Sequence, residues 1–266
     1  MLLDDAAPSA VRRDRLLRAI TERGFLRVTD AAVELGVSGV TVRSDFAVLE
    51  SLGEIIRVHG GAMPRSRGAS EASFESSLEM EAAAKRAIGR RAAGLVASGN
   101  SVIVDVGSTA LAIANALVDR RDLTDLLVIT NGLSIALALE AAMPRFTIVV
   151  TGGTLRPLQH SLVDPFASTF LESLTVDLAF IGCNGVDADR GVTNANLPEA
   201  EVKKRMLASA DRAFAVADPS KLGRARLGAI GRLDAFEALI TSSDAPAEEV
   251  ARLKAAGMTV LLADPS

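Results

Sequence analysis

The chain has 266 residues, enough for one small and one medium domain with a hydrophobic core. One cysteine and two histidines argue against disulfides and against a metal cluster, and no cofactor is expected. The chain has no apolar run that could span a bilayer and no basic-then-apolar leader, so we expect a cytoplasmic protein without membrane contact. The net charge of −4 disfavours nucleic acid only weakly, because DNA binding depends on the charge of one face.

The first fifty residues predict three helices. Apolar residues recur at helical spacing from about residue 10 to 23, and Gly24 would end that helix. Thr29 is expected to cap a second helix that Gly36 closes. Ser38 repeats the cap for a third helix, so the pattern is typical of a helix-turn-helix.

The third helix has an apolar face and an opposite face suited to DNA. Val42, Phe46 and Leu49 follow the i, i+4, i+7 spacing and should point inward. After Gly53, the alternating residues 54–58 predict a short hairpin strand, which makes the module a winged helix. The expected DNA contacts are Ser38, Thr41, Arg43, Ser44, Arg57 and His59.

The charge of this module is nearly balanced. Residues 1–67 contain ten arginines and nine acidic residues, and the rest of the chain has 19 basic and 24 acidic residues. DNA affinity must therefore come from a few placed arginines and from dimerisation.

Composition divides the chain into a winged helix-turn-helix domain (8–62), a linker (63–78) and a larger domain (79–266). In the larger domain, a helix is expected from about Glu79 to Ala97, followed by apolar strands that alternate with helices. This pattern predicts an α/β fold with a mostly parallel, Rossmann-like sheet covered on both faces. The expected strands are 102–104, 126–129, 146–150, 178–181, 213–217, 238–241 and 259–262.

Polar, glycine-bearing turns follow five of these strands, at the edge where open α/β sheets bind ligands. Asp105 ends the first strand and is followed by Gly107, Ser108 and Thr109 at the start of a helix, an arrangement typical of a phosphate cradle. The other turns supply Thr130, Asn131, Gly152, Gly153, Arg156, Asn184, Gly185, Asp218 and Lys221. Neither a dinucleotide fingerprint nor a Gly-Lys-Ser/Thr loop is present, which favours a small phosphorylated sugar or polyol.

Residues 12–62 resemble the N-terminal domain of the DeoR family of bacterial transcription regulators, and the chain from about Ala84 resembles that family's sensor domain. The sensor motifs appear as 85–89, 105–109, 130–132, 152–156, 177–182 and 218–221. The resemblance implies a phosphosugar-responsive regulator in which the first-strand loop, Lys85, Asp218 and Lys221 contact the effector. Two positions depart from the family pattern: Ser44 stands where a second arginine is usual, and Asp164 where glycine is usual.

The sensor fold also resembles ribose-5-phosphate isomerase, which supplies an enzyme alternative. That enzyme has an Asp-Gly-Ala-Asp loop followed by a lysine, whereas this chain has Asn184-Gly185-Val186-Asp187 and no lysine before Gly191. One carboxylate and one cation needed for proton transfer are missing, which favours ligand binding over turnover. A constitutive architectural protein, the third class, would not need a polar sheet rim.

We therefore predict a repressor of a sugar or polyol catabolic operon. It would bind a double-stranded DNA operator as a homodimer or homotetramer, and a phosphorylated sugar would release it.

Overall fold

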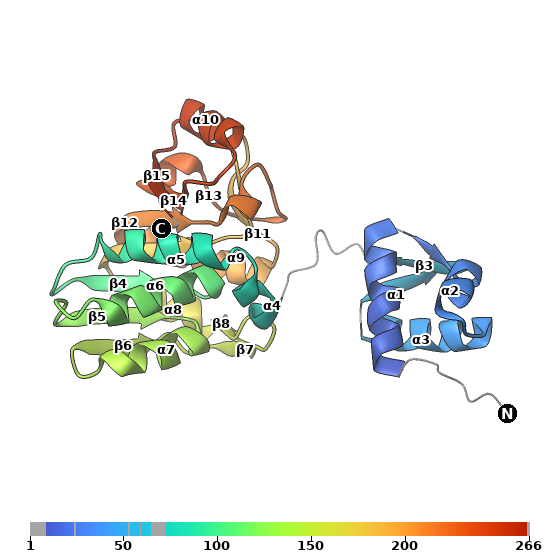
Figure 1. The fold of residues 1–266 in the computed structure, drawn as a ribbon. Coiled ribbons are helices and arrows are strands. Elements are labelled where there is room, and N and C mark those ends of the chain that lie inside the picture. The colour runs from blue at the N-terminus through green and yellow to red at the C-terminus, as the bar shows by residue number, and fades with distance from the viewer. Residues whose placement is uncertain (1–8, 24, 53, 59, 65–72, 265–266) are drawn as a thin grey trace. The chain divides into compact units, whose positions relative to one another are not determined.

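The computed structural model describes residues 9–23, 25–52, 54–58, 60–64 and 73–264. The chain forms two compact units, residues 1–70 and 71–266, which are taken in turn (Figure 1). Among the described residues the longest helix has 15 residues, and no helix has the length and apolar character that crossing a bilayer takes.

The N-terminal unit is a winged helix-turn-helix. Its helices are α1 (Ser9–Arg23), α2 (Val28–Leu35) and α3 (Gly39–Ser51). Its antiparallel sheet has the order β1-β3-β2, with β1 (Leu26–Arg27), β2 (Ile55–Val58) and β3 (Gly61–Pro64). The predicted inward residues Val42, Phe46 and Leu49 are buried against Leu16 and Ile20 of α1, so the predicted helix faces are confirmed.

Two of the predicted caps are confirmed and one is wrong. Gly36 ends α2 in the left-handed conformation (φ 63°), and the Ser38 hydroxyl accepts a hydrogen bond from the Thr41 amide at 3.1 Å. Thr29 does not cap α2, which begins one residue earlier, at Val28. The Val28 amide donates instead to the wing carbonyl of Gly60 at 3.0 Å, so a tertiary contact replaces the side-chain cap. Gly24, Gly53 and His59 lie outside the described residues.

The C-terminal unit is built on a seven-stranded parallel sheet with the order β15-β14-β12-β9-β4-β5-β6. All seven predicted strands are present, and the strand order reverses direction between β4 and β9, the type of place where doubly wound sheets bind ligands. The strands are β4 (Ser101–Val104), β5 (Leu126–Thr130), β6 (Phe146–Val150), β9 (Val176–Gly182), β12 (Ala210–Val216), β14 (Ala238–Ser242) and β15 (Val260–Ala263).

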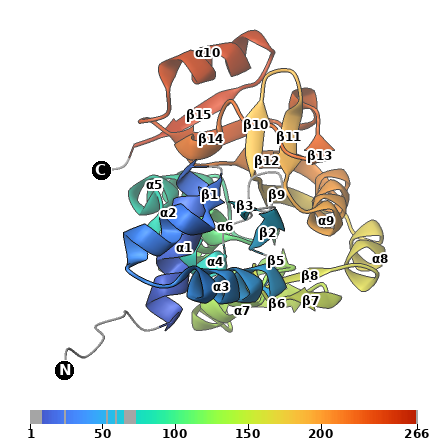
Figure 2. The ribbon, with the colours of Figure 1, turned by 90° about the vertical axis from the view of Figure 1, so that its right-hand side faces the viewer.

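Helices cover both faces of this sheet (Figure 2). One apolar core joins the sheet to α5 (Ala82–Ala93), α6 (Ser108–Asp119) and α7 (Leu133–Leu139). A second core joins the other face to α8 (Phe166–Glu172), α9 (Leu197–Ala208) and α10 (Ala247–Ala255). The predicted two-sided cover is therefore confirmed.

Several elements were not predicted, because each is short and has no periodic pattern of its own. A hairpin joins β7 (Thr154–Arg156) to β8 (Ser161–Val163), and a small antiparallel sheet has the order β10-β11-β13. Its strands are β10 (Gly185–Asp187), β11 (Gly191–Asn194) and β13 (Gly228–Gly231). Three 3-10 turns also occur, at 140–142, 219–221 and 233–235.

The predicted linker, residues 63–78, differs from the structure at both ends. Residues 63–64 belong to β3, and a short helix, α4 (Phe74–Glu79), lies inside the last part of the range. Ser73 caps α4, and Phe74 is buried although its neighbours in sequence are polar. The helix expected from Glu79 to Ala97 is shorter, because α5 spans only Ala82–Ala93.

Candidate DNA-binding and effector sites

The outer face of α3 presents the predicted recognition residues. Arg43 and Ser44 are exposed, and Val40 near the start of the helix is 73% exposed. Ser38 and Thr41 lie at its N-terminus, where their hydroxyl oxygens are 2.9 Å apart. Ser38 therefore caps the helix, and the Thr41 hydroxyl is a hydrogen-bond partner of the Ser38 hydroxyl.

Asp45, which the sequence reasoning left without a role, holds α3 against α1. Its carboxylate is buried and accepts from the Arg12 guanidinium at 2.6 Å, with Arg13 at 3.7 Å. The hydrogen bond to Asp45 raises the pKa of Arg12. The sequence signal for this contact was an acidic residue on the buried face of a helix, beside Val42 and Phe46.

In the wing, Arg57 is paired within its own unit. Its Nε donates to Glu50 Oε2 at 2.7 Å, and the side chain is 47% exposed. Glu50 is on α3, so this pair fixes the strand β2 to the C-terminal part of the recognition helix. The sequence reasoning did not foresee this partner.

The loop after β4 turns into α6 through a glycine in the left-handed region. Gly107 has φ 112°, a conformation that favours glycine. A Cβ atom added there would have no atom from beyond the two neighbouring residues within 4 Å. The next residue, Ser108, begins α6, and no side chain caps this helix. The first amides of α6 are thus without a capping side chain.

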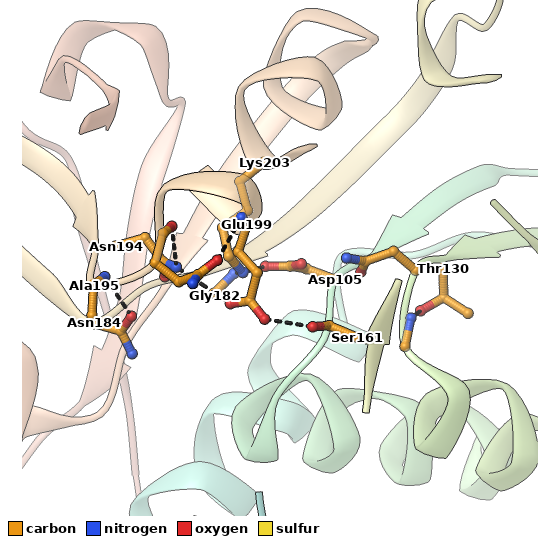
Figure 3. Close-up of polar contacts among 12 residues, drawn as sticks. Asp105, Thr130, Ser161, Gly182, Asn184, Asn194, Ala195, Glu199 and Lys203 are labelled. Atoms are coloured by element: carbon orange, nitrogen blue, oxygen red, sulfur yellow. Dashed lines mark hydrogen bonds and ion pairs between the residues drawn. The ribbon is translucent and has the colours of Figure 1, made fainter. Parts of the chain in front are cut away.

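A buried ion pair lies at the place where the strand order reverses. Asp105 follows β4, and its Oδ2 accepts from the Lys203 ammonium and from the Gly182 amide at the end of β9, the latter at 2.9 Å (Figure 3). Burial acts to lower the pKa of Lys203, but Asp105 and Glu199 outweigh it and the pKa is raised. The other carboxylate oxygen, Asp105 Oδ1, is buried and has no hydrogen-bond partner among the described residues.

Glu199, one helical turn before Lys203, gathers a second set of polar groups. It is an ion-pair partner of Arg156 and accepts from Ser161 Oγ at 2.5 Å and from Asn194 Nδ2 at 3.3 Å (Figure 3). Sequence reasoning missed both Glu199 and Lys203. The available signal was that they share the inward face of α9 with Val202 and Met206, where charged residues are rare.

Lys85 lies in the first turn of α5 and is buried. Its ammonium donates to the carbonyls of Ser77 at 2.7 Å and Met80 at 2.6 Å, and it lies 3.8 Å from Asp218 Oδ2. Burial lowers the pKa of Lys85, Asp218 opposes this, and nearby Lys221 adds to it. Lys85 and Asp218 therefore lie together, and Lys221 is in the 3-10 turn that Asp218 caps. That these three residues contact an effector, as the family resemblance implies, stays a prediction.

Lys85 and Ser108 also line one groove of about 600 Å³ along α5 and α6. Ala112, Ala116 and Arg86 are among its other lining residues.

The remaining predicted rim residues mainly shape the backbone. Gly153 lies so close to β8 that an added Cβ would be 2.2 Å from the Val163 carbonyl oxygen, and Gly185 is similarly close to Arg224. The Asn184 side chain accepts from the Ala195 amide at 2.9 Å, and the Thr130 hydroxyl accepts from Gly132 at 3.0 Å. Gly152 has φ 73°, and Thr109 is half-buried in the first turn of α6.

Asn131 resembles Asp105 in having an unused acceptor. Its Nδ2 donates to the Leu162 carbonyl at 3.2 Å, and its Oδ1 is buried without a partner among the described residues. Asp164, the departure from the family pattern, accepts from the Ser168 amide at 3.2 Å at the start of α8. Its carboxylate is therefore engaged by a helix amide.

Comparison with known proteins agrees with this architecture. Residues 12–67 match the DeoR-like helix-turn-helix domain, and residues 80–243 match the DeoR C terminal sensor domain. A ribose 5-phosphate isomerase from Plasmodium falciparum is a partial structural neighbour, with a TM-score of 0.39 and 16% identity over 53% of each chain.

Full-length relatives are named as transcription regulators. The transcriptional regulator GlpR of Haloferax volcanii is 34% identical, covering 95% of this chain and 97% of the relative. The transcriptional repressor CsqR of Escherichia coli is 32% identical, covering 94% of each. The glycerol-3-phosphate regulon repressor of Haemophilus influenzae is 29% identical, covering 92% of this chain and 93% of the relative.

The two matched domains together cover most of the chain, and the relatives named above are transcription regulators that match it over nearly their whole length. The chain belongs to the DeoR family of DNA-binding transcriptional regulators.

Proposed function

We propose that the protein is a cytoplasmic repressor that leaves its operator when its sensor domain binds a small phosphorylated sugar or polyol. The observation that carries the proposal is that buried Lys85 and the uncapped N-terminus of α6 at Ser108 line one groove. A helix N-terminus and an ammonium group are both suited to a phosphate dianion. Lys221, in the 3-10 turn capped by Asp218, would add a second cation.

The hydroxyl groups of the ligand would be recognised at the centre of the sheet. Asp105 Oδ1 and Asn131 Oδ1 are acceptors at the ends of the neighbouring strands β4 and β5, and both are buried without a protein partner in the described part of the chain. A buried acceptor without a partner costs free energy, so a donor from a ligand or water is favoured there. A ligand with hydroxyl donors fits this requirement.

Relatives support the class of effector and the sense of regulation. One is named a glycerol-3-phosphate regulon repressor and another a transcriptional repressor. We propose that Ser38, Thr41, Arg43, Ser44, Arg57 and His59 contact the operator, and that a homodimer or homotetramer places recognition helices in successive major grooves.

A thermal-shift screen tests the effector. Phosphorylated sugars and polyols, glycerol 3-phosphate among them, would each be compared with the unphosphorylated compound. We expect a phosphorylated member to raise the melting temperature with concentration and its counterpart to have no effect, because only binding to the native state stabilises it. Lys221→Met should shift this response to higher concentration. Equal responses to both members of every pair would contradict the proposal.

Operator binding tests the sense of regulation. The compound selected by the screen should weaken operator binding in a titration at constant ionic strength. Tighter binding would identify the compound as a co-repressor and contradict release.

A further inference from the structure

Helix α4 is the first element after the segment that joins the two units, and it is docked on the sensor domain at two ends. At its start, the Phe74 amide donates to the Leu158 carbonyl at 2.9 Å, and the buried Phe74 ring lies 5.0 Å from the His160 ring, centroid to centroid. Glu75 Oε1 lies 3.2 Å from His160 Nε2. The turn between β7 and β8 therefore anchors the N-terminal end of α4.

At its other end, α4 depends on Lys85. The Ser77 and Met80 carbonyls accept from the Lys85 ammonium, which is also the group that faces Asp218 at the sheet rim. The distance of 3.8 Å to Asp218 exceeds that of a hydrogen bond, so two neutral carbonyls are the direct partners of this buried charge. The same side chain thus touches the end of α4 and the site proposed for the phosphate.

We propose that a phosphate group at the rim and helix α4 compete for the Lys85 ammonium, so that ligand binding undocks α4 from the sensor domain. The inference rests on the effector site proposed above. A phosphate carries a full negative charge, and an ion pair with it is stronger than hydrogen bonds to uncharged carbonyls. Drawing Lys85 toward Ser108 and Lys221 withdraws the hydrogen bonds that hold the C-terminal end of α4.

Undocking α4 affects the DNA-binding unit because it lengthens the segment that connects the two units. Residues 73–81 would then add to the segment between the units. In a dimer whose connections already span two half-sites, a longer connection lowers the effective concentration of the second recognition helix at its half-site. The ligand would in this way weaken operator binding without touching the DNA-binding unit.

The chain allows a clean optical test because it contains no tryptophan. Leu78 of α4 is 38% exposed and lines the groove, so Leu78→Trp places the single indole on α4. Inorganic phosphate is the probe, with sodium chloride at equal ionic strength as the reference. We expect phosphate to raise the melting temperature and to shift the tryptophan emission to the red, as the indole moves into water.

Matched variants separate the coupling residue from a simple phosphate contact. In the Leu78→Trp background, Lys85→Met should remove the emission shift at every phosphate concentration. Lys221→Met should move the midpoint of the emission shift to a higher phosphate concentration but leave its full amplitude unchanged. If Lys85→Met does not fold, Phe74→Ala loosens α4 at its other end, where Phe74 contacts Leu158 and His160, and its emission should be red-shifted before phosphate is added.

The outcomes separate the two proposals. A phosphate-dependent rise in melting temperature without an emission shift would overturn the competition at Lys85 and leave the anion site standing. The absence of both effects, in phosphate and with the sugar phosphates of the screen, would overturn the anion site itself. A full emission shift in Lys85→Met would also overturn the role of Lys85.

Discussion

At the recognition helix, two exposed side chains offer different kinds of base contact. Arg43 is a charged fork that can bind guanine through two hydrogen bonds, whereas Val40 is apolar and 73% exposed. Neither side chain contributes to the buried core of the unit, which consists of residues such as Val42 and Phe46. Changes at Arg43 and Val40 should therefore affect DNA binding more than folding.

Arg43→Ala should cost about 1 to 3 kcal/mol of specific operator binding and relax base preference at one position in each half-site. The reason is the loss of a bidentate contact to a base. Titrations with the operator and with single-base variants measure it. Unchanged operator affinity would remove Arg43 from the residues that read bases.

Val40 should recognise a thymine methyl group, because an exposed apolar residue near the N-terminus of a recognition helix faces the base edges. Replacing each thymine of the operator by uracil removes only that methyl group. At one position, this replacement should lower the operator affinity of the wild-type protein and leave the operator affinity of Val40→Ala unchanged. Equal sensitivity of both proteins at every position would contradict this contact.

At the scale of elements, side chains join segments that are far apart in sequence. Asp45 joins α3 to α1 through Arg12, and Glu199 joins α9 to the β7–β8 hairpin through Arg156 and Ser161. Asp177 on β9 joins the start of β4, since its Oδ2 accepts from the Ser101 amide at 2.7 Å. The Asp177 contact links β9 to β4, the two strands between which the strand order reverses.

The Asp177 contact predicts a pH-dependent stability. The hydrogen bond from the Ser101 amide lowers the pKa of Asp177, so its contribution is present above the unfolded-state pKa of about 3.9 and is lost as pH falls through the lower folded value. Asp177→Asn should be less stable by about 1 kcal/mol or less at pH 7, since the group is exposed.

Denaturant unfolding at pH 7 and near pH 3 measures this difference, which should shrink as the wild-type carboxylate is protonated. Asp211→Asn, an exposed aspartate on β12, is the matched control. An Asp177→Asn deficit that is equally large at both pH values would show that the charge is not responsible.

At the scale of the whole molecule, the two compact units have separate cores, and the C-terminal unit holds the Asp105–Lys203 pair. Lys203→Met should destabilise that unit by about 3 to 5 kcal/mol, because it leaves a buried carboxylate without its cation. Calorimetry should show the loss in the transition of the sensor domain only. An equal fall in the melting temperature of the N-terminal unit would mean that the two units unfold together. Lys204→Met, an exposed neighbour on α9, serves as the control.

The sequence by itself determined the two domain types, all seven strands of the parallel sheet and the recognition helix, because each depends on periodicity or on a local cap. It also predicted Asp105, Gly107, Asp218 and Lys221 at one rim, since the carboxyl ends of parallel strands share one edge, whereas Lys85 was added by the family resemblance alone. A start signal such as Thr29 failed where a wing carbonyl satisfied the helix amide instead.

Only the tertiary structure decided which charged groups meet. Lys203 is 98 residues from Asp105 in sequence, and Glu199 is 43 residues from Arg156. Local patterns carry no record of such pairings, because the packing of α9 and the β7–β8 hairpin against the sheet creates them. The docking of α4 through Lys85 belongs to the same class. Helix α4 has only six residues, too few for a recognisable helical periodicity. Its position is set by contacts with the β7–β8 turn and with the buried Lys85 ammonium.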